Sequence, residues 1–315
     1  MHAASVFHEG ERAVQARAGE AVIADHNGTV LSTQVIPGAR AFISKQFMAA
    51  VASVDQQGRV WSSVLFGQPG FLHTADGTTI LVDVARAERD ASDPFWANIG
   101  TKAQVGMLFI EIGSRRRYRV NGALLAEHEG GIEIGIREAY PNCPKFIQRR
   151  KLVDMGQGVG VDAGALSGTS IDAALATLIA HADTLFVASV HAERGADASH
   201  RGGAPGFVTL LDAHTLRIPD YQGNSMFNTL GNFSVDPHAG ICIPDFAGNR
   251  LLQLTGRVTL RWDEPDPRGL TGGTGRFWDV AVDSWHLRAI PQRLEWEYLD
   301  ASPFNPPVGA QESLS

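Results

Sequence analysis

The sequence lacks the features that mark several common classes of protein. It has only two cysteines, Cys143 and Cys242, so neither a disulfide framework nor a four-thiolate zinc site can be built. Acidic residues outnumber basic residues by 34 to 27, and the net charge of -7 argues against a nucleic-acid partner. Scarce cysteine suits a reducing compartment, and we therefore expect a cytoplasmic protein.

Signals for membranes and for common catalytic machinery are missing as well. No stretch reaches the ~18 apolar residues of a membrane span, and the opening residues carry Glu9 and Glu11 instead of an apolar segment. We therefore expect neither export nor a membrane partner. The G-x-S-x-G, H-E-x-x-H and P-loop motifs are absent, and the 11 histidines show no metal-ligand spacing, so we expect no metal site.

An internal repeat is the most informative feature that the sequence does contain. Five short matches recur in the same order at spacings of 134 or 136 residues. They pair Ala52-Ser53-Val54 with Ala188-Ser189-Val190, Pro69-Gly70-Phe71 with Pro205-Gly206-Phe207, Asn98 with Asn232, Gly106 with Gly240, and Gly122 with Gly256. Such a series predicts two copies of one domain of ~135 residues.

Each copy is expected to open with a helix and to continue as short strands. In the second copy Ser170 is placed to cap a helix whose apolar residues follow helical spacing to Ile179. Apolar runs separated by Gly, Asp, Asn and Pro then predict strands at 185–190, 206–211, 215–218, 240–243, 251–254 and 257–262. Many short antiparallel strands favour a barrel, because closure removes unpaired edges.

These elements predict a first domain over 1–155 and a second over 168–305. Between them, 156–167 is rich in glycine without meeting the G-x-G-x-x-G pattern, and we interpret it as a linker. The proline-rich end leads into a flexible tail over 306–315.

The second copy contains the strongest candidate binding site. Ser199, Arg201 and Gly202 are expected to share a loop, and a hydroxyl, a guanidinium and a glycine backbone are suited to hold a phosphate monoester. Asp220 and Asn224 lie on a Gly-containing turn, where they could hydrogen-bond a ribityl chain or a ring edge. The alternative is that both stretches are ordinary turns.

The first copy has no such loop, because Ser63-Val64-Leu65-Phe66 stands in its place. It has an arginine run instead. Alternation along a strand would direct Arg115, Arg117 and Arg119 to one face, toward a ligand held by the other copy or toward solvent.

Cys143 is a candidate nucleophile, since basic residues from Lys145 to Arg150 could lower the pKa of its thiol. The alternative is a helix start that buries this cysteine.

Together these motifs resemble the flavin-nucleotide-binding proteins related to pyridoxamine 5'-phosphate oxidase. The matching stretches of the second copy are Ser199 to Gly202, Pro205 to Phe207, Ile218 to Asn224, Thr229 to Asn232, Asp236 to Gly240 and Leu254 to Val258. In the first copy Phe7 to Glu11, Val60 to Ser63, Gly67 to Phe71 and Ala139 to Arg149 resemble bacterial proteins that fuse such a domain to a ferredoxin-reductase-type module. The resemblance extends from residue 7 to about residue 305.

The resemblance implies a mainly β fold with flanking helices, built as two tandem split β-barrel domains. In this family two barrels, usually of a homodimer, hold FMN in the groove between them. A tandem repeat could supply both barrels from one chain, and the chain could also form a homodimer. Ser199, Arg201 and Gly202 match the phosphate side of the motif. The residues that match the rest of the flavin site are Ile218, Pro219, Asp220, Gly223, Asn224, Ser225 and Asn232.

Two departures from the family pattern bear on function. Relatives commonly place a basic residue just after Gly-Asn, where this chain has Ser225-Met226, so Arg117 or Lys145 would have to supply the missing phosphate contact. True pyridoxamine phosphate oxidases resemble one another in a C-terminal R-L-H-D-R segment, whereas here the nearest string runs from Arg293 to Glu297 as R-L-E-W-E. Vitamin B6 oxidation is therefore not expected.

The leading hypothesis is an FMN-dependent oxidoreductase that acts on a small-molecule substrate. Its electrons would come from NAD(P)H or from a separate reductase, and its catalytic residues are not identified by the sequence. The main alternative is a protein that binds a flavin or a metabolite without turnover. A purely structural module has less support, because the polar site of the second copy exceeds what a scaffold needs.

Overall fold

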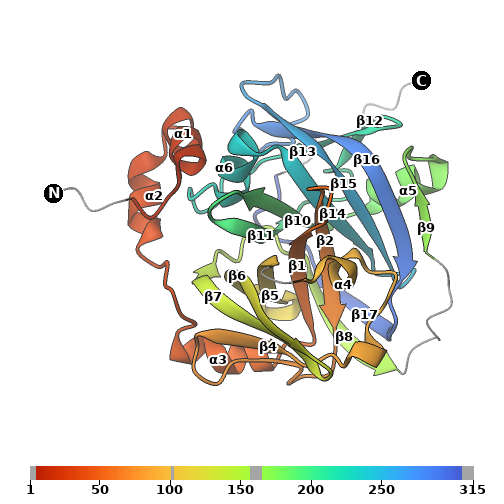
Figure 1. Ribbon diagram of the computed structural model, residues 1–315. Helices are drawn as coiled ribbons and strands as arrows, with labels where there is room; N and C mark the ends of the chain where they lie inside the picture. The colour runs from red at the N-terminus through yellow and green to blue at the C-terminus, as the bar shows by residue number, and fades with distance from the viewer. Residues whose placement is uncertain (1–4, 101–102, 157–164, 307–315) are drawn as a thin grey trace.

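The computed structural model describes residues 5–100, 103–156 and 165–306, and it consists mainly of antiparallel strands (Figure 1). Two expected segments lie largely outside the described residues. They are the tail expected at 306–315, of which only residue 306 is described, and most of the linker expected at 156–167.

The first copy forms a sheet of seven strands. Along the sheet the strands follow the order β2-β1-β5-β6-β7-β4-β3, and every pairing is antiparallel. The strands are β1 (Met48–Val54), β2 (Val60–Phe66), β3 (Leu72–His73), β4 (Thr79–Val82), β5 (Gln104–Glu111), β6 (Arg116–His128) and β7 (Gly131–Asn142).

The second copy repeats this topology. Its strands follow the order β11-β10-β14-β15-β16-β13-β12. Adding nine to each strand number of the first sheet gives this same order. One further strand, β9 (Leu166–Gly168), pairs with β16. The strands are β10 (Thr184–His191), β11 (Gly195–Gly202), β12 (Thr209–Asp212), β13 (Thr215–Pro219), β14 (His238–Asp245), β15 (Arg250–Arg261) and β16 (Phe277–Ala289). The matching topology supports the duplication inferred from the repeat.

Pairing registers agree with the repeated residues as well. Ala52 pairs with Gly106 in the first sheet, and Ala188 pairs with Gly240 in the second. Each sheet also has an irregularity that ends at its repeated glycine, Gly122 or Gly256. A Cβ atom at either glycine would lie about 2 Å from a carbonyl oxygen of the neighbouring strand, so the bulge requires glycine.

A third, two-stranded sheet joins the two copies. It pairs β8 (Arg149–Gly156), which follows the first sheet, with β17 (Arg293–Asp300), which follows the second.

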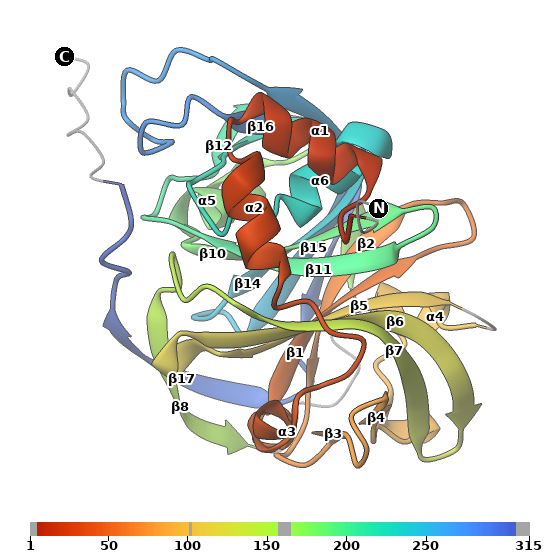
Figure 2. The ribbon, with the colours of Figure 1, turned by 90° about the vertical axis from the view of Figure 1, so that its left-hand side faces the viewer.

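Most helices pack on the sheet of their own copy, but the first two do not. The helices are α1 (Glu9–Arg17), α2 (Ala21–Gly28), α3 (Pro37–Ser44), α4 (Pro94–Asn98), α5 (Ala173–His181) and α6 (Asn228–Val235), with short 3-10 turns η1 (Arg86–Glu88) and η2 (Ile112–Ser114). In both views α1 lies against α6 of the second copy, far from α3 (Figures 1 and 2). Gly10 and Gly231 permit this contact, because a Cβ at Gly10 would lie 2.3 Å from the Gly231 carbonyl oxygen.

Several local expectations were wrong. Asp172, not Ser170, caps α5, since its carboxylate accepts a hydrogen bond from Leu175 N at 2.9 Å. The strands expected at 251–254 and 257–262 form one continuous strand, β15, and the strand expected at 206–211 begins only at Thr209. No helix begins at Cys143, because β7 ends at Asn142 and β8 starts at Arg149.

The stretch around Ser199, expected as a loop, is the strand β11 paired along its length with β10. Its sequence, GADASHRG, has no β-branched or aromatic residue, which removed the usual strand signal.

The two barrels share a core of their own in addition to one core inside each barrel. On β1, Ala49 and Val51 point into the first barrel, whereas Ala50 and Ala52 face the second. On β10 the same alternation places Leu185 and Val187 inside and Phe186 and Ala188 at the interface. Both faces of these strands are buried, which explains their continuous apolar runs.

The closest approach of the two barrels depends on one pseudo-equivalent pair of glycines. A Cβ at Gly106 would lie 2.7 Å from backbone atoms of Asp197 and Ala198 in the second barrel. A Cβ at Gly240 would lie 2.6 Å from backbone atoms of Trp61 and Ser62 in the first. Each barrel therefore offers one glycine to a strand of the other.

We expect Gly240→Ala to lower the free energy of unfolding by ~1–3 kcal/mol, because the added methyl group overpacks a backbone contact. Gly38→Ala is the matched control: Gly38 lies in α3 with no atom within 4 Å of its Cβ position, so alanine should stabilise by ~0.5–1 kcal/mol. Urea unfolding of the three proteins measures both effects. Equal stability of Gly240→Ala and the unsubstituted protein would contradict this account of the interface.

Candidate functional site

A pocket opens where the two barrels meet, and both copies contribute to its wall. From the first copy come β6 and the segment after β7; from the second come the end of β11, the segment after β13 and the start of α6. The lining residues are Arg117, Arg119, Asn142, Cys143, Lys145, Phe146, Ser199, His200, Arg201, Gly202, Asp220, Tyr221, Gly223, Asn224, Ser225, Phe227, Asn228 and Thr229. This set holds four cationic side chains and one carboxylate.

Arg117 has only neutral partners. Its guanidinium donates to the carbonyl oxygens of Cys143 at 2.6 Å and Lys145 at 3.5 Å, and its Nη1 lies 3.3 Å from His200 Nδ1. No carboxylate of the described residues forms an ion pair with it. Burial and the neighbouring charge of Arg119 lower the pKa of Arg117 to about 9, so the group is still charged at neutral pH.

Arg119, by contrast, is held by a polar network. It lies 3.0 Å from Asp197 and donates to the Tyr140 hydroxyl at 2.9 Å and to the Ser199 hydroxyl. Burial opposes its charge, but Asp197 and Tyr140 outweigh burial and raise its pKa. Thr229 donates to the same Ser199 oxygen at 3.0 Å. Ser199 is therefore fixed within the wall of the pocket.

His200 and Arg201 carry buried donors without partners. Burial, then Arg117 and Arg201, hold the pKa of His200 well below its usual value, so the ring is neutral. Because His200 Nδ1 faces a guanidinium donor, its proton lies on Nε2, and this buried nitrogen has no hydrogen-bond partner. Arg201 Nε and Arg119 Nε are buried without partners as well. A ligand with several acceptor oxygens would satisfy these groups.

The segment from Asp220 to Asn228 is held from outside by the N-terminal helices. Asn27 donates to Asn224 O at 2.8 Å, Gln15 donates to Met226 O at 3.0 Å, and Ser225 donates to Glu20 at 2.5 Å.

Within this segment Ser225 and Phe227 have φ values of 62° and 59°, a left-handed conformation that non-glycine residues adopt at a cost. The contacts from α1 and α2 stabilise that conformation at the pocket wall.

The sequence-predicted residues divide into two groups. Nine of them line the pocket: Ser199, Arg201, Gly202, Asp220, Gly223, Asn224, Ser225, Arg117 and Lys145. Three lie elsewhere: Ile218 and Pro219 are buried in β13, and Asn232 bonds Ser189 and His8. Arg115, expected on the same face as Arg117, pairs instead with Asp300.

Several pocket residues escaped the sequence analysis. Arg119 was noted only as part of the arginine run, and His200 only as a member of the stretch from Ser199 to Gly202, without a role of its own. Phe146, Tyr221 and Phe227 add aromatic surface, with the rings of Phe146 and Tyr221 4.5 Å apart. Cys143 lines the pocket in a half-buried position, which the expected helix start would not have allowed. Met226 points away from the pocket and packs with Phe7, Ala24 and Tyr140.

One part of the chain matches a known protein family. The sequence profile described as pyridoxamine 5'-phosphate oxidase matches residues 36–132, which span β1 to β6 of the first barrel. Residues 36–132, which form most of the first barrel, are therefore similar to the pyridoxamine 5'-phosphate oxidase family. No curated protein matches the chain significantly.

Several solved structures are similar to parts of this chain. A pyridoxamine 5'-phosphate oxidase-related, FMN-binding protein from Nostoc punctiforme is 17% identical, with 42% of this chain and 100% of that one covered at a TM-score of 0.27. HupZ of Group A Streptococcus is 14% identical, with 42% and 98% covered at a TM-score of 0.29. An F420 reductase is 15% identical, with 34% and 90% covered at a TM-score of 0.24. Among the described residues, no helix is long and apolar enough to cross a membrane.

Because the two sheets have matching topology, the pocket has a pseudo-equivalent position on the opposite side of the interface. Pairing registers equate Ser199 with Ser63, Arg119 with Gln253 and Asn142 with Arg288. One contact is kept: Gln253 donates to the Ser63 hydroxyl at 2.8 Å, as Arg119 donates to Ser199.

The cationic groups, however, are lost at the second position. Leu251 replaces Arg117 and Leu65 replaces Arg201. Arg288, whose side chain is 2% exposed, fills the space and pairs with Asp93 and, at 2.6 Å, with Asp90. The protein has thus neutralised this position with its own side chains.

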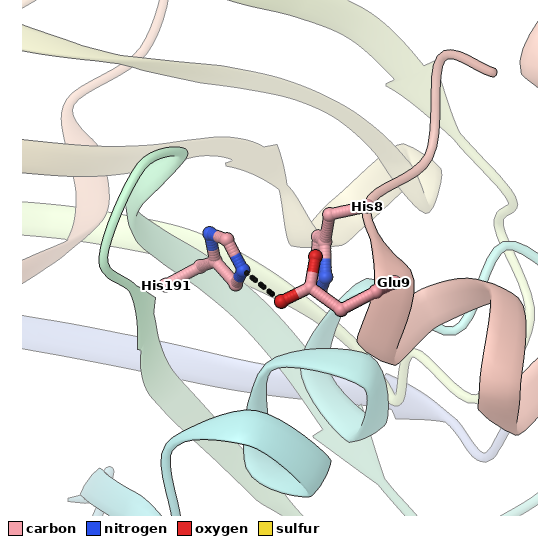
Figure 3. A group of neighbouring side chains, drawn as sticks. All are labelled: His8, Glu9 and His191. Carbon is pink, nitrogen blue, oxygen red and sulfur yellow. Dashed lines mark hydrogen bonds and ion pairs between the residues drawn. The ribbon is translucent and has the colours of Figure 1, made fainter. Parts of the chain in front are cut away.

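A cluster of His8, Glu9 and His191 lies where α1 meets the second barrel (Figure 3). The two rings are stacked with centroids 4.1 Å apart. Backbone amides donate to Nδ1 of both rings, so each Nε2 carries the proton and donates, to Asn232 from His8 and to Glu9 from His191. Both Nε2 atoms are therefore donors in hydrogen bonds that attach α1, and these bonds oppose metal ligation.

We expect Arg288→Met to lower the free energy of unfolding by ~3–5 kcal/mol, because Asp90 and Asp93 would remain buried without a counter-charge. Arg250→Met, which removes a half-exposed pair with Asp245, should cost at most ~1 kcal/mol. Chemical unfolding compares the two. Similar losses for both variants would contradict the assignment of Arg288 as the neutralising group.

Glu11 should make stability depend on pH. Burial raises its pKa to about 7, so its contribution is fully present below pH ~4.5 and is lost as the pH rises through 7. His8, Glu138 and Arg194 are the charged or titratable groups around it. We expect Glu11→Gln to be more stable than the unsubstituted protein at pH 8 but not at pH 4.5. Exposed Glu88→Gln is the control, and an equal shift in both variants would refute the role of burial.

Proposed function

We propose that the protein binds FMN in the pocket between its barrels and acts as an oxidoreductase on a small-molecule substrate. The observation that supports this proposal is the charge of the pocket. Arg117 has no carboxylate partner among the described residues, and three further cationic side chains line the same pocket. Buried cationic groups favour an anionic ligand that compensates them.

The residues present fit a phosphate monoester. Arg201 Nε and His200 Nε2 are buried donors that lack partners, and the phosphate end of FMN offers several acceptor oxygens. We assign the phosphate to Arg201, Arg117 and His200. Lys145, whose Nζ lies 5.5 Å from the Phe304 ring centroid, can reach the same end from the rim.

The other end of the pocket fits a ring system. Phe146, Tyr221 and Phe227 provide flat apolar surface, and no atom lies within 4 Å of a Cβ placed on Gly223, so the turn leaves space there. Asn224 and Ser225 carry polar groups beside that space. Amphipathic surface of this kind suits an isoalloxazine ring and its ribityl chain.

A bound flavin would supply reversible electron and hydride transfer, while the chain would bind, orient and shield it. The arginines would anchor the phosphate, and the fixed wall around Ser199 would set the depth of the ligand. The N-terminal helices, which hold the segment from Asp220 to Asn228, would keep water from that side. We propose NAD(P)H or a separate reductase as electron donor.

Both walls of the pocket come from one chain, so we propose one FMN per chain, bound without a partner subunit. The pseudo-equivalent position, filled by Arg288, would take none. Oxidation of pyridoxamine phosphate is not proposed, because the segment from Arg293 to Glu297 forms part of β17 and contributes no residue to the pocket lining.

A flavin- or metabolite-binding protein without turnover is the second candidate. The observation that favours it is the closed second position, since Arg288, Asp90 and Asp93 leave only one of the two pseudo-equivalent positions open to a ligand. Reduction of the bound flavin by NAD(P)H and its reoxidation by a substrate would distinguish an enzyme from a carrier.

We expect the purified protein to absorb in the visible range and to release FMN on denaturation, at one FMN per chain. Arg201→Ala should weaken FMN binding by ~10–150-fold, because one charge-assisted contact of ~1.5–3 kcal/mol is lost. Titration with FMN, followed by quenching of flavin fluorescence, measures this.

Arg257→Ala is the control, since Arg257 is exposed and lies outside the pocket lining. A colourless protein that takes up no added FMN would overturn the proposed cofactor, and unchanged affinity in Arg201→Ala would overturn the phosphate assignment.

A further inference from the structure

Arg276 is a buried cation behind the pocket that the sequence gives no reason to select. It precedes β16, is 7% exposed and does not line the pocket. Its Nε donates to Asp220 Oδ2 at 3.0 Å, and its Nη1 lies 3.4 Å from Glu20. Its guanidinium carbon lies 5.1 Å from the centre of the Phe227 ring. Arg276 therefore contacts two residues of the pocket wall from outside.

Asp220 lies between two guanidinium groups and is closer to one of them. Its Oδ2 is hydrogen-bonded to Arg276, whereas its Oδ1 lies 3.8 Å from Arg201 Nη2, beyond hydrogen-bond distance. Asp220 is 3% exposed and is the one carboxylate in the pocket lining. A closer approach to Arg201 would pair the two charges and remove Arg201 as a site for an anion.

Glu20 fixes the other side of Arg276. This residue comes just before α2, and its carboxylate accepts from the Ser225 hydroxyl at 2.5 Å in addition to facing Arg276. Arg276 is thus held between Asp220 of the pocket and Glu20 of the N-terminal segment. The order Arg201, Asp220, Arg276, Glu20, Ser225 alternates charge and ends on the wall of the same pocket.

We propose that Arg276 is a positioning residue that keeps Asp220 away from Arg201, so that the Arg201 guanidinium is available to the phosphate of the ligand. The proposal rests on the proposed function, since it concerns affinity for the phosphate end of FMN. It predicts an effect on that end alone. Without Arg276, the Asp220 carboxylate turns to Arg201 and competes with the ligand.

The test compares FMN with riboflavin, which has the same ring and no phosphate. Arg276→Met should weaken FMN binding by ~10–100-fold, the range of one charge-assisted contact, and leave riboflavin affinity unchanged. Arg276→Lys, which retains a cation, should fall between. The double variant Arg276→Met/Asp220→Asn should recover FMN affinity, because the competing carboxylate is gone. A merely structural role for Arg276 would weaken both ligands and would not be rescued.

Two further variants keep the proposal testable if Arg276→Met does not fold. Asp220→Asn alone should bind FMN at least as tightly as the unsubstituted protein, and a tenfold loss would overturn the proposal. Arg217→Met removes a comparable pair, with Asp279 in the same barrel but outside the pocket, and should leave FMN affinity unchanged.

The outcomes separate the two proposals. If the unsubstituted protein binds riboflavin and FMN equally or binds neither, the phosphate site itself is refuted, and the role of Arg276 with it. If FMN binds more tightly than riboflavin but Arg276→Met leaves that preference intact, only the positioning role is refuted.

Discussion

The close approach of two backbones at Gly106 and Gly240 is the constraint on which the rest of the molecule depends. Each glycine lies so close to a strand of the other barrel that even a Cβ atom would clash with its backbone. With alanines on β1, β10 and β11 they bring the barrels into one core. Because the barrels are this close, β6 of one and β11 of the other can form opposite walls of a single pocket. The pocket is thus a consequence of how the copies pack.

Duplication alone would have produced two equal pockets, and electrostatics explains why they differ. Guanidinium groups withdrawn from water need compensation, either from the protein or from a ligand. At Arg288 the protein supplies it, through Asp90 and Asp93. At Arg117 the described carboxylates supply none, and the neighbouring donors of His200 and Arg201 are unpaired as well. In one of the two pseudo-equivalent positions the guanidinium charge is therefore compensated by carboxylates of the protein. In the other position the described carboxylates do not compensate it, and an anionic ligand could do so.

The sequence predicted those parts that follow from spacing. The repeat located both interface glycines and implied matching topology, and strand alternation placed Arg117 and Arg119 on one face. The sequence did not predict the features that depend on tertiary contacts. The strand β11 has no strand-forming residues of its own and exists because β10 pairs with it. Arg276 and Glu20 are 256 residues apart, so no local pattern could join them to Asp220.

The N-terminal segment shows why the two halves could not remain independent after duplication. Its helices precede the first barrel in sequence, but α1 packs on α6 of the second. Gln15, Glu20 and Asn27 hydrogen-bond the pocket segment in which Ser225 and Phe227 adopt a left-handed conformation. In a pair of separate barrels this support would have to be present twice. Within one chain it supports the single pocket that this segment lines. Among the described residues, the pseudo-equivalent position has no such support from the N-terminal segment, and the pairs of Arg288 with Asp90 and Asp93 fill it with the protein's own charges.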